Sequence, residues 1–125
     1  MRVLRHVHRL CRPGATILDL TSVPPPAAVE AAGDVVGHLD QRVFLARAAV
    51  TELAVDRFVA DGHLAELASI RFPVLKHFDS ATEAISDMDA RPVSRLPAEL
   101  RDRLAEVTAP VVERSWSLLR ALRVQ

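Results

Sequence analysis

Residues 8–20, HRLCRPGATILDL, constrain the fold more than any other stretch because two different structural patterns meet there. Residues 2–11 place apolar side chains at helical spacing, with arginines and histidines on the opposite face. Pro13 prevents that helix from continuing, and Gly14 supplies the backbone freedom that a helix end needs. Ala15–Leu20 follow as a short apolar run, which predicts a central strand that is covered on both faces.

The basic face of this first helix has two interpretations. Its arginines could contact phosphate or an anionic partner, because clustered basic side chains attract such groups. A basic helix face is more often simply exposed to solvent. We therefore favour the solvated face.

Composition and charge exclude several classes of protein. The chain has 125 residues, of which 50% are apolar and 26% charged, so it can form one globular domain without a metal or disulfide. Its formal net charge is zero, which does not favour nucleic-acid binding and mildly favours self-association. Cys11 is the single cysteine and cannot form an internal disulfide. No apolar run has the length of a membrane helix, so we expect a cytoplasmic protein.

The middle of the chain predicts an alternation of strand and helix. The prolines at 24–26 predict that Thr21–Pro26 is an extended connector outside any sheet, followed by a short helical turn at Ala27–Ala32. Val35–Leu39 predicts a weak strand interrupted by Gly37. Asp40 is placed as the N-cap of a long helix over residues 41–60, which is apolar enough to be covered on more than one side. The polar residues Arg42, Glu52 and Asp56 are expected on its exposed face.

The second half completes an α+β pattern. Alternating apolar residues predict a half-buried strand over 69–78, and Pro73 places it at a sheet edge or a bulge. Ser80 and Glu83 form a capping box for a short helix, and Pro97 begins another. Residues 111–124 fit either a helix or a strand. We expect an α+β fold, resembling a fragment of an α/β fold, with about four strands in a mixed sheet covered by three to five helices.

Two histidine-aspartate pairs are candidates for a functional site. His38 and Asp40 would share one strand face, and His77 and Asp79 repeat the same spacing. Two such pairs at adjacent strand ends could form an acid/base site or a metal site. Each aspartate is also explained as a turn or cap residue, which is the commoner role. Cys11 lies on an apolar stripe, which predicts a buried, inert thiol.

The stretch RVLRHVHRLCRPGATILDL resembles a segment of class I S-adenosylmethionine-dependent methyltransferases, in which a helix ends in an Arg-Pro-Gly-Gly turn before the fifth strand. The matching residues are Arg9, Leu10, Arg12, Pro13 and Gly14. Ala15 stands where the family usually has a second glycine, and Cys11 where an aliphatic residue is commoner. The resemblance implies that residues 1–125 are a single C-terminal domain of that fold. It implies a long helix, a penultimate strand, a helical insertion and a last antiparallel strand.

The same resemblance implies that the cofactor site is missing. In that family a glycine-rich loop and an acidic residue of the first half hold the methyl donor, whereas no two glycines here form a G-x-G element. It implies a domain without its own S-adenosylmethionine site or other cofactor, unless a partner supplies the missing half, and without independent catalysis. Such a domain would be a remnant or the distal part of a split enzyme, and its open sheet edge would bind a second copy or a protein partner. The alternative is a small self-contained ligand-binding domain or enzyme with a cleft between Thr21–Pro26 and His77–Ser80.

Overall fold

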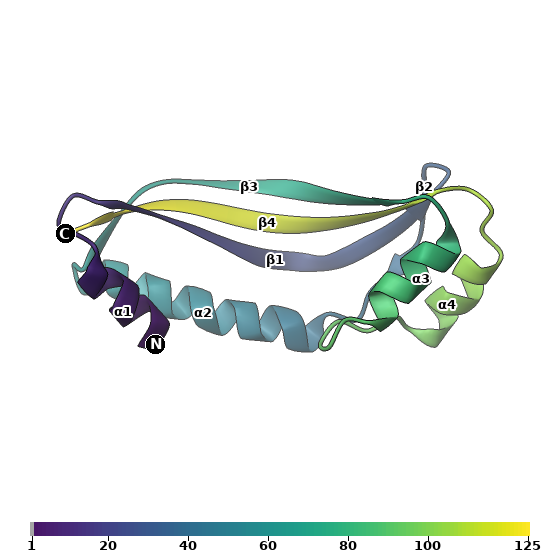
Figure 1. The fold of residues 1–125 in the computed structure, drawn as a ribbon, viewed down its shortest axis with the longest axis horizontal. Helices are drawn as coiled ribbons and strands as arrows, with labels where there is room; N and C mark the ends of the chain where they lie inside the picture. The colour runs from purple at the N-terminus through teal and green to yellow at the C-terminus, as the bar shows by residue number, and fades with distance from the viewer. Residues whose placement is uncertain (1) are drawn as a thin grey trace. The chain divides into compact units, whose positions relative to one another are not determined.

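The computed structural model describes residues 2–125, and these form an α+β fold of four helices and four strands (Figure 1). The elements in chain order are α1 (Arg2–Leu10), β1 (Thr16–Ala31), β2 (Asp34–His38), α2 (Arg42–Ala60), β3 (Leu64–Phe78), α3 (Ala81–Asp89), α4 (Ala98–Ala105) and β4 (Val111–Val124). The strands form one sheet in the order β2-β1-β4-β3. The predicted fold class is therefore confirmed, although neighbouring strands are antiparallel rather than mixed. Within residues 2–125, no helix is both long enough and apolar enough to cross a membrane.

The chain forms two compact units. Unit 1 contains the described residues up to Val23 together with Ala46–Phe72 and Ser117–Gln125, and unit 2 contains Pro24–Leu45 and Pro73–Trp116. Three strands, β1, β3 and β4, pass from one unit into the other, as does α2. Each unit has its own cluster of buried apolar side chains.

The predicted helix-turn-strand junction begins unit 1. Gly14 has a φ of 86°, which a residue with a Cβ rarely adopts. Its amide donates to the Val124 carbonyl at 2.7 Å, and the Val124 amide donates to the Ala15 carbonyl at 2.8 Å. These bonds join the start of β1 to the end of β4. The apolar cluster of this unit consists of Val55, Leu64, Leu122 and Val124, with Leu4, Cys11, Ala15, Ile17, Phe58 and Val59 packed against it.

Two predictions about coverage in unit 1 are wrong. Leu18 and Leu20 of β1 are 68% and 63% exposed, so this strand is covered on one face and not on both. Alternate side chains of a strand point to opposite faces, and α1 and α2 lie on one face only (Figure 1). The helix α2 is also covered on one side, because Val50 and Leu53 are more than half exposed.

Unit 2 corrects the prediction for the proline segment. Thr21–Pro26 belong to β1, and Ala27–Ala31 continue the strand instead of forming a helical turn. β2 pairs with β1 only from Ala28 to Ala31, so no strand adjoins the outer side of β1 at the prolines, and a proline that faces outward there removes no ladder hydrogen bond. Ala32 and Gly33, with φ of 52° and 83°, form the turn into β2, since a two-residue hairpin turn of this kind needs positive φ at both positions.

The remaining elements of unit 2 agree with the sequence. The Glu83 amide donates to Ser80 Oγ at 3.2 Å and the Asp79 amide donates to Glu83 Oε2 at 3.1 Å, which confirms the capping box of α3. Residues 111–124, left open above, form β4. It adjoins β3, and β3 is the edge strand that Pro73 indicated. The core side chains of this unit are Ala27, Val29, Leu39, Phe78, Ala81, Ala84, Met88, Leu100, Leu104 and Val111.

Candidate functional site

The two predicted histidine-aspartate pairs lie on different edges of the sheet. His38 ends β2 and His77 lies in β3, and the order β2-β1-β4-β3 puts two strands between them. Both histidine side chains are exposed. Residues 2–125 contain no group of three or more histidine, cysteine or carboxylate side chains that could hold a metal ion. The fold therefore does not assemble the acid/base or metal site expected from these pairs.

Asp40 and Asp79 have the cap and turn roles that were the alternative to a catalytic role. Asp40 Oδ1 accepts from the Arg42 amide at 3.2 Å at the start of α2, and Asp40 Oδ2 lies 2.9 Å from Arg42 Nη2. The hydrogen bonds from the Arg42 side chain and backbone lower the pKa of Asp40 to about 2. Asp79 contributes its amide to the capping box of α3. The alternative cleft is also not formed as expected, because its two walls belong to β1 and to the end of β3, with β4 between these strands.

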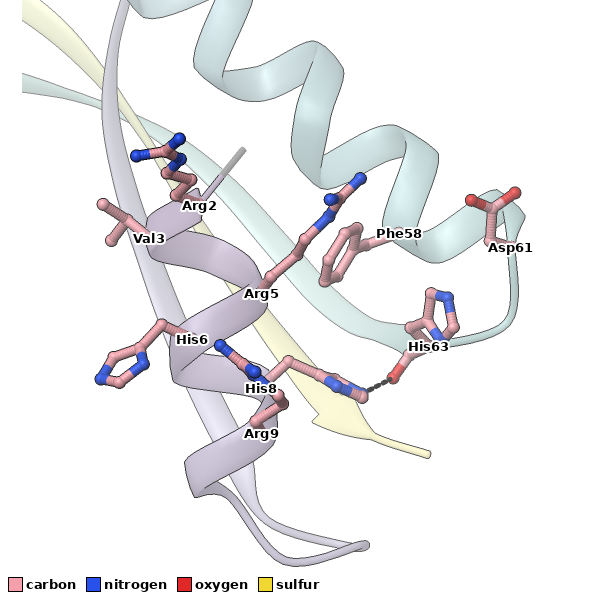
Figure 2. Close-up of a pocket in the computed structure, with 9 residues that line it drawn as sticks. All are labelled: Arg2, Val3, Arg5, His6, His8, Arg9, Phe58, Asp61 and His63. Carbon is pink, nitrogen blue, oxygen red and sulfur yellow. Dashed lines mark hydrogen bonds between the residues drawn. The ribbon is translucent and has the colours of Figure 1, made fainter.

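A pocket of about 880 Å³ lies in unit 1 beside α1 and the C-terminal end of α2 (Figure 2). The side chains that line it are Arg2, Val3, Arg5, His6, His8, Arg9, Phe58, Asp61 and His63. His8 Nε2 donates to the His63 carbonyl at 3.1 Å, which ties α1 to the turn after α2. The ring of Phe58 lies 5.8 Å from the His8 ring and 5.3 Å from the His63 ring, between centroids. The three rings form an aromatic wall.

The pocket has an excess of basic groups. Among the described residues, three arginines and three histidines line it, and Asp61 is the one carboxylate. Arg2, Arg5 and Arg9 follow one another at intervals of three and four residues and therefore share a face of α1. Among residues 2–125, none of these three guanidinium groups has an ion pair or a hydrogen bond. The face that the sequence favoured as simply solvated is thus one side of a pocket.

A second group of charges surrounds Arg120 in unit 1. Its side chain is 8% exposed, and Nη1 lies 3.0 Å from Glu52 Oε2 and 2.9 Å from Asp56 Oδ1. Its Nε donates to Glu66 Oε1 at 2.8 Å. Burial disfavours the charge of Arg120, but these hydrogen bonds more than offset that effect and raise its pKa. Glu52 was expected on the exposed face of α2 and instead lies toward the sheet, with its side chain 15% exposed.

Glu52 is also paired with a second carboxyl group. Asp19 Oδ2 and Glu52 Oε1 are both buried and have no hydrogen-bond donor among the described residues. Burial and the contact with the Asp19 carboxyl raise the pKa of Glu52 to about 7. Two adjacent carboxylates repel one another, so one proton shared between these oxygens satisfies both of them. Glu52 therefore retains its proton up to about pH 7.

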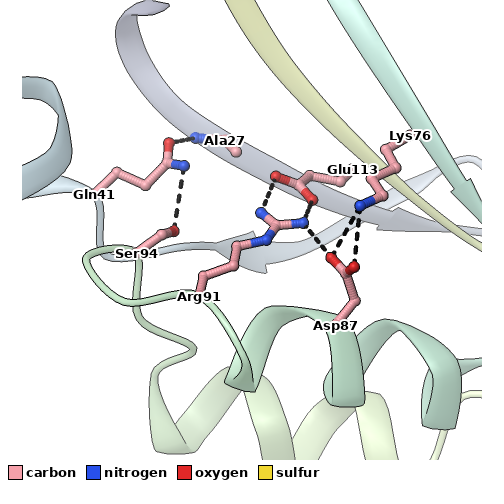
Figure 3. A network of polar contacts seen from close by, with 7 residues as sticks. All are labelled: Ala27, Gln41, Lys76, Asp87, Arg91, Ser94 and Glu113. Atoms are coloured by element: carbon pink, nitrogen blue, oxygen red, sulfur yellow. Dashed lines mark hydrogen bonds and ion pairs between the residues drawn. The ribbon is translucent and has the colours of Figure 1, made fainter. Parts of the chain in front are cut away.

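Unit 2 contains a separate polar network (Figure 3). Glu113 of β4 accepts two hydrogen bonds from Arg91, at 2.7 and 2.6 Å, and Arg91 also donates to Asp87 at 2.6 Å. Lys76 Nζ lies 3.0 Å from Asp87 Oδ1. The hydrogen bonds that Arg91 donates to Glu113, and then those to Asp87, raise the pKa of Arg91 against the opposing effect of its burial. These contacts attach the loop after α3 to the sheet.

Gln41 forms the second part of this network (Figure 3). Its Oε1 accepts from the buried Ala27 amide at 2.8 Å, and its Nε2 donates to Ser94 Oγ at 3.3 Å. Gln41 and Ser94 are 6% and 7% exposed. Every polar atom named here has a partner inside the unit, which indicates a structural role for the network.

The outer edge of β3 is the most extensive unpartnered feature of the sheet. β3 has 15 residues, and only its first and last are buried. Four of its apolar side chains are more than 40% exposed: Leu67, Ile70, Val74 and Leu75. β3 is the last strand in the sheet order, so its outward backbone groups have no strand partner within residues 2–125.

Comparisons with protein-family models, with curated proteins and with solved structures find no match to this chain. The functional argument therefore depends on the pocket, the charge clusters and the open strand edge. The sequence contains a signal for the charge cluster around Glu52: Asp19 is a lone carboxylate within the apolar run ATILDL. A charge in a half-buried strand needs a partner from another element.

Proposed function

We propose that this chain is a methyltransferase-related domain without an S-adenosylmethionine site of its own, which functions as a self-associating module. The observation that carries the self-association is the open edge of β3. A strand of 15 residues with exposed apolar side chains is an unusually long edge, and natural proteins normally protect such edges by short length, charge or cover. The partner that fits this edge best is a second copy of β3.

The sequence of β3 is complementary to itself. When two copies pair antiparallel so that the whole strand overlaps, the exposed Leu67 faces the exposed Leu75. In the same register Glu66 faces Lys76, and the side chains of both are substantially exposed, at 41% and 54%. Opposite charges and apolar pairs directly across two strands each stabilise the pairing by about 0.2–1 kcal/mol. Two-fold symmetry produces each of these pairs twice.

The central pair of this register is the one unfavourable contact. Arg71 would face its own copy on the two-fold axis, and like charges directly opposite one another are destabilising. Arg71 is exposed, and long arginine side chains on a strand edge can turn apart into solvent. Its repulsion acts once, whereas each favourable pair acts twice.

The backbone of β3 also suits this pairing. Backbone groups of successive residues in a strand point alternately to the two neighbouring strands. The His63 carbonyl accepts from the Gln125 amide at 3.1 Å, so odd-numbered residues direct their backbone groups toward β4. By this alternation Pro73 belongs to the inner set, and the even-numbered residues at the open edge all retain an amide donor. Pro73 therefore removes no hydrogen bond from the proposed pairing.

The element order supports the relation to methyltransferases. A helix, an Arg-Pro-Gly turn, a strand, a long helix, a penultimate strand, a helical insertion and a last strand follow one another as the resemblance implies. The last strand, β4, lies between β1 and β3 and runs antiparallel to both. We also propose a cytoplasmic location, because one cysteine provides no internal disulfide.

A cysteine cross-link tests the register of the β3 pairing. In a Cys11→Ser background, Arg71→Cys would bring two thiols together on the two-fold axis, at the close spacing of a non-hydrogen-bonded pair. We expect a disulfide-linked dimer under mild oxidation, measured by non-reducing electrophoresis. Ser69→Cys is the matched control, because its copies lie several residues apart and should remain unlinked.

Two results would overturn the proposal. Equal cross-linking of the two variants would exclude this register, because random collision does not distinguish neighbouring exposed positions. A monomer of the unmodified chain by light scattering across the micromolar to millimolar range would exclude self-association itself.

A further inference from the structure

We propose that the unit 1 pocket binds a small phosphate monoester through Arg5 and Arg9. This inference is independent of the self-association at β3, because it uses a different set of residues. Neither the methyltransferase resemblance nor the predicted site residues assigned a ligand to this pocket.

The first argument is the uncompensated charge. Arg2, Arg5 and Arg9 are exposed on one face of α1, and Asp61 is the single carboxylate among the pocket-lining side chains. Guanidinium groups on adjacent helical turns repel one another, whereas Arg91 and Arg120 each contact carboxylates. An anion in the pocket would relieve this repulsion.

The second argument is the geometry of the donors. Arg5 and Arg9 are four residues apart, so their side chains leave adjacent turns of α1 in the same direction. Figure 2 shows Arg5 projecting toward Phe58 and His8 directed to the His63 carbonyl. A guanidinium group presents planar paired donors that match two oxygens of a phosphate. Two of them on one face can hold a dianion that has three terminal oxygens.

The third argument is the wall opposite the arginines. Because His8 Nε2 donates to a backbone carbonyl, its ring is held in place. The Phe58 ring contacts both the His8 and His63 rings, which supplies apolar surface next to the basic groups. A volume of about 880 Å³ is within the range of small-molecule sites and exceeds what one inorganic phosphate fills. The ligand therefore carries an organic group as well as the phosphate.

Titration of the isotope-labelled full chain, followed by amide resonances in NMR spectra, tests this site with AMP as the probe and adenosine as its phosphate-free counterpart. We expect saturable shifts in α1 and near His63 with AMP and none with adenosine. Added sodium chloride should weaken the AMP binding, because the arginines are exposed to solvent. Arg5→Ala and Arg9→Ala should each raise the dissociation constant about tenfold, since each removes a charge-assisted contact.

Arg47→Ala is the matched control, because Arg47 is an exposed arginine of α2 that does not line the pocket. It should leave the affinity for AMP unchanged. Arg5→Lys, which keeps the charge and removes the planar fork, should bind with intermediate affinity. Arg5 and Arg9 are exposed, so their replacement should not alter the thermal unfolding midpoint.

Several outcomes would overturn the proposal. These are the absence of saturable shifts with AMP, equal binding of adenosine, or an equal loss of affinity in the Arg47→Ala variant. Binding of a short single-stranded oligonucleotide more tightly than AMP would assign the face to nucleic acid instead of a small ligand.

Discussion

Replacement of Glu52 by glutamine should remove a pH dependence from the stability of unit 1. Glu52 lies between Asp19 and Arg120, and its burial and its contact with Asp19 raise its pKa from 4.5 to about 7. Below about pH 4.5 the group is protonated in both the folded and the unfolded state and contributes no slope. Between about pH 4.5 and 7 only the folded state holds the proton, so the free energy of unfolding falls as the pH rises.

The size of this effect follows from the shift. Each unit of pKa difference corresponds to about 1.4 kcal/mol, so the change from 4.5 to about 7 amounts to about 3 kcal/mol lost by pH 8. Glutamine resembles the protonated glutamic acid, because it can donate to Asp19 and accept from Arg120. The Glu52→Gln variant should therefore match the parent near pH 4.5 and be about 3 kcal/mol more stable at pH 8.

Urea unfolding followed by circular dichroism at several pH values between 4.5 and 8.5 measures this difference. Parent and variant differ only at residue 52, so the parent-minus-variant difference isolates Glu52. Asp56→Asn is the control, because it removes another negative charge beside Arg120 but leaves the pair of Glu52 and Asp19 intact. If parent and Glu52→Gln have parallel stability curves, the shared-proton interpretation is refuted.

Two further predictions concern unit 2 and are checked by the same unfolding measurement. Gln41→Leu should destabilise the protein by about 1–3 kcal/mol, because the fully buried Ala27 amide loses its acceptor; no loss would mean that the amide finds another partner. Gly37→Ala should cost about 1–3 kcal/mol, because the new Cβ would lie 2.9 Å from Cδ1 of the buried Leu100. In a Leu100→Ala background this second substitution should add little, and an undiminished loss there would contradict the steric explanation.

The sequence was most informative where one local rule determined the structure. The Pro13-Gly14 break and the Ser80-Glu83 capping box each depend on a few neighbouring atoms, and the structure has both. The prolines at 24–26 led to a wrong prediction, because a strand tolerates them where its outer side has no neighbour. Whether the outer side of β1 has a neighbour depends on how far β2 extends along it, and a local sequence pattern does not give that length.

The charged residues were less predictable for a similar reason. Glu52 has the spacing of a solvent-exposed helix position, and only the approach of Arg120 from β4 makes a low exposure tolerable. Strand spacing can place His38 with Asp40, and His77 with Asp79, on one face, but it does not say whether the two pairs lie on adjacent strands. Their separation follows from the strand order, which puts β2 and β3 on opposite edges.

The prolines of β1 have a consequence for how an assembly of this protein would stop growing. Along the outer side of β1, β2 occupies Ala28–Ala31 and the prolines at 24–26 leave at least one position without an amide donor, so an incoming strand finds at most the first half of β1 open. β3 offers a full-length edge with its outward donors intact. When only one edge of a sheet can pair with a strand of another molecule, assembly stops at two molecules. Two such edges would permit open-ended fibres.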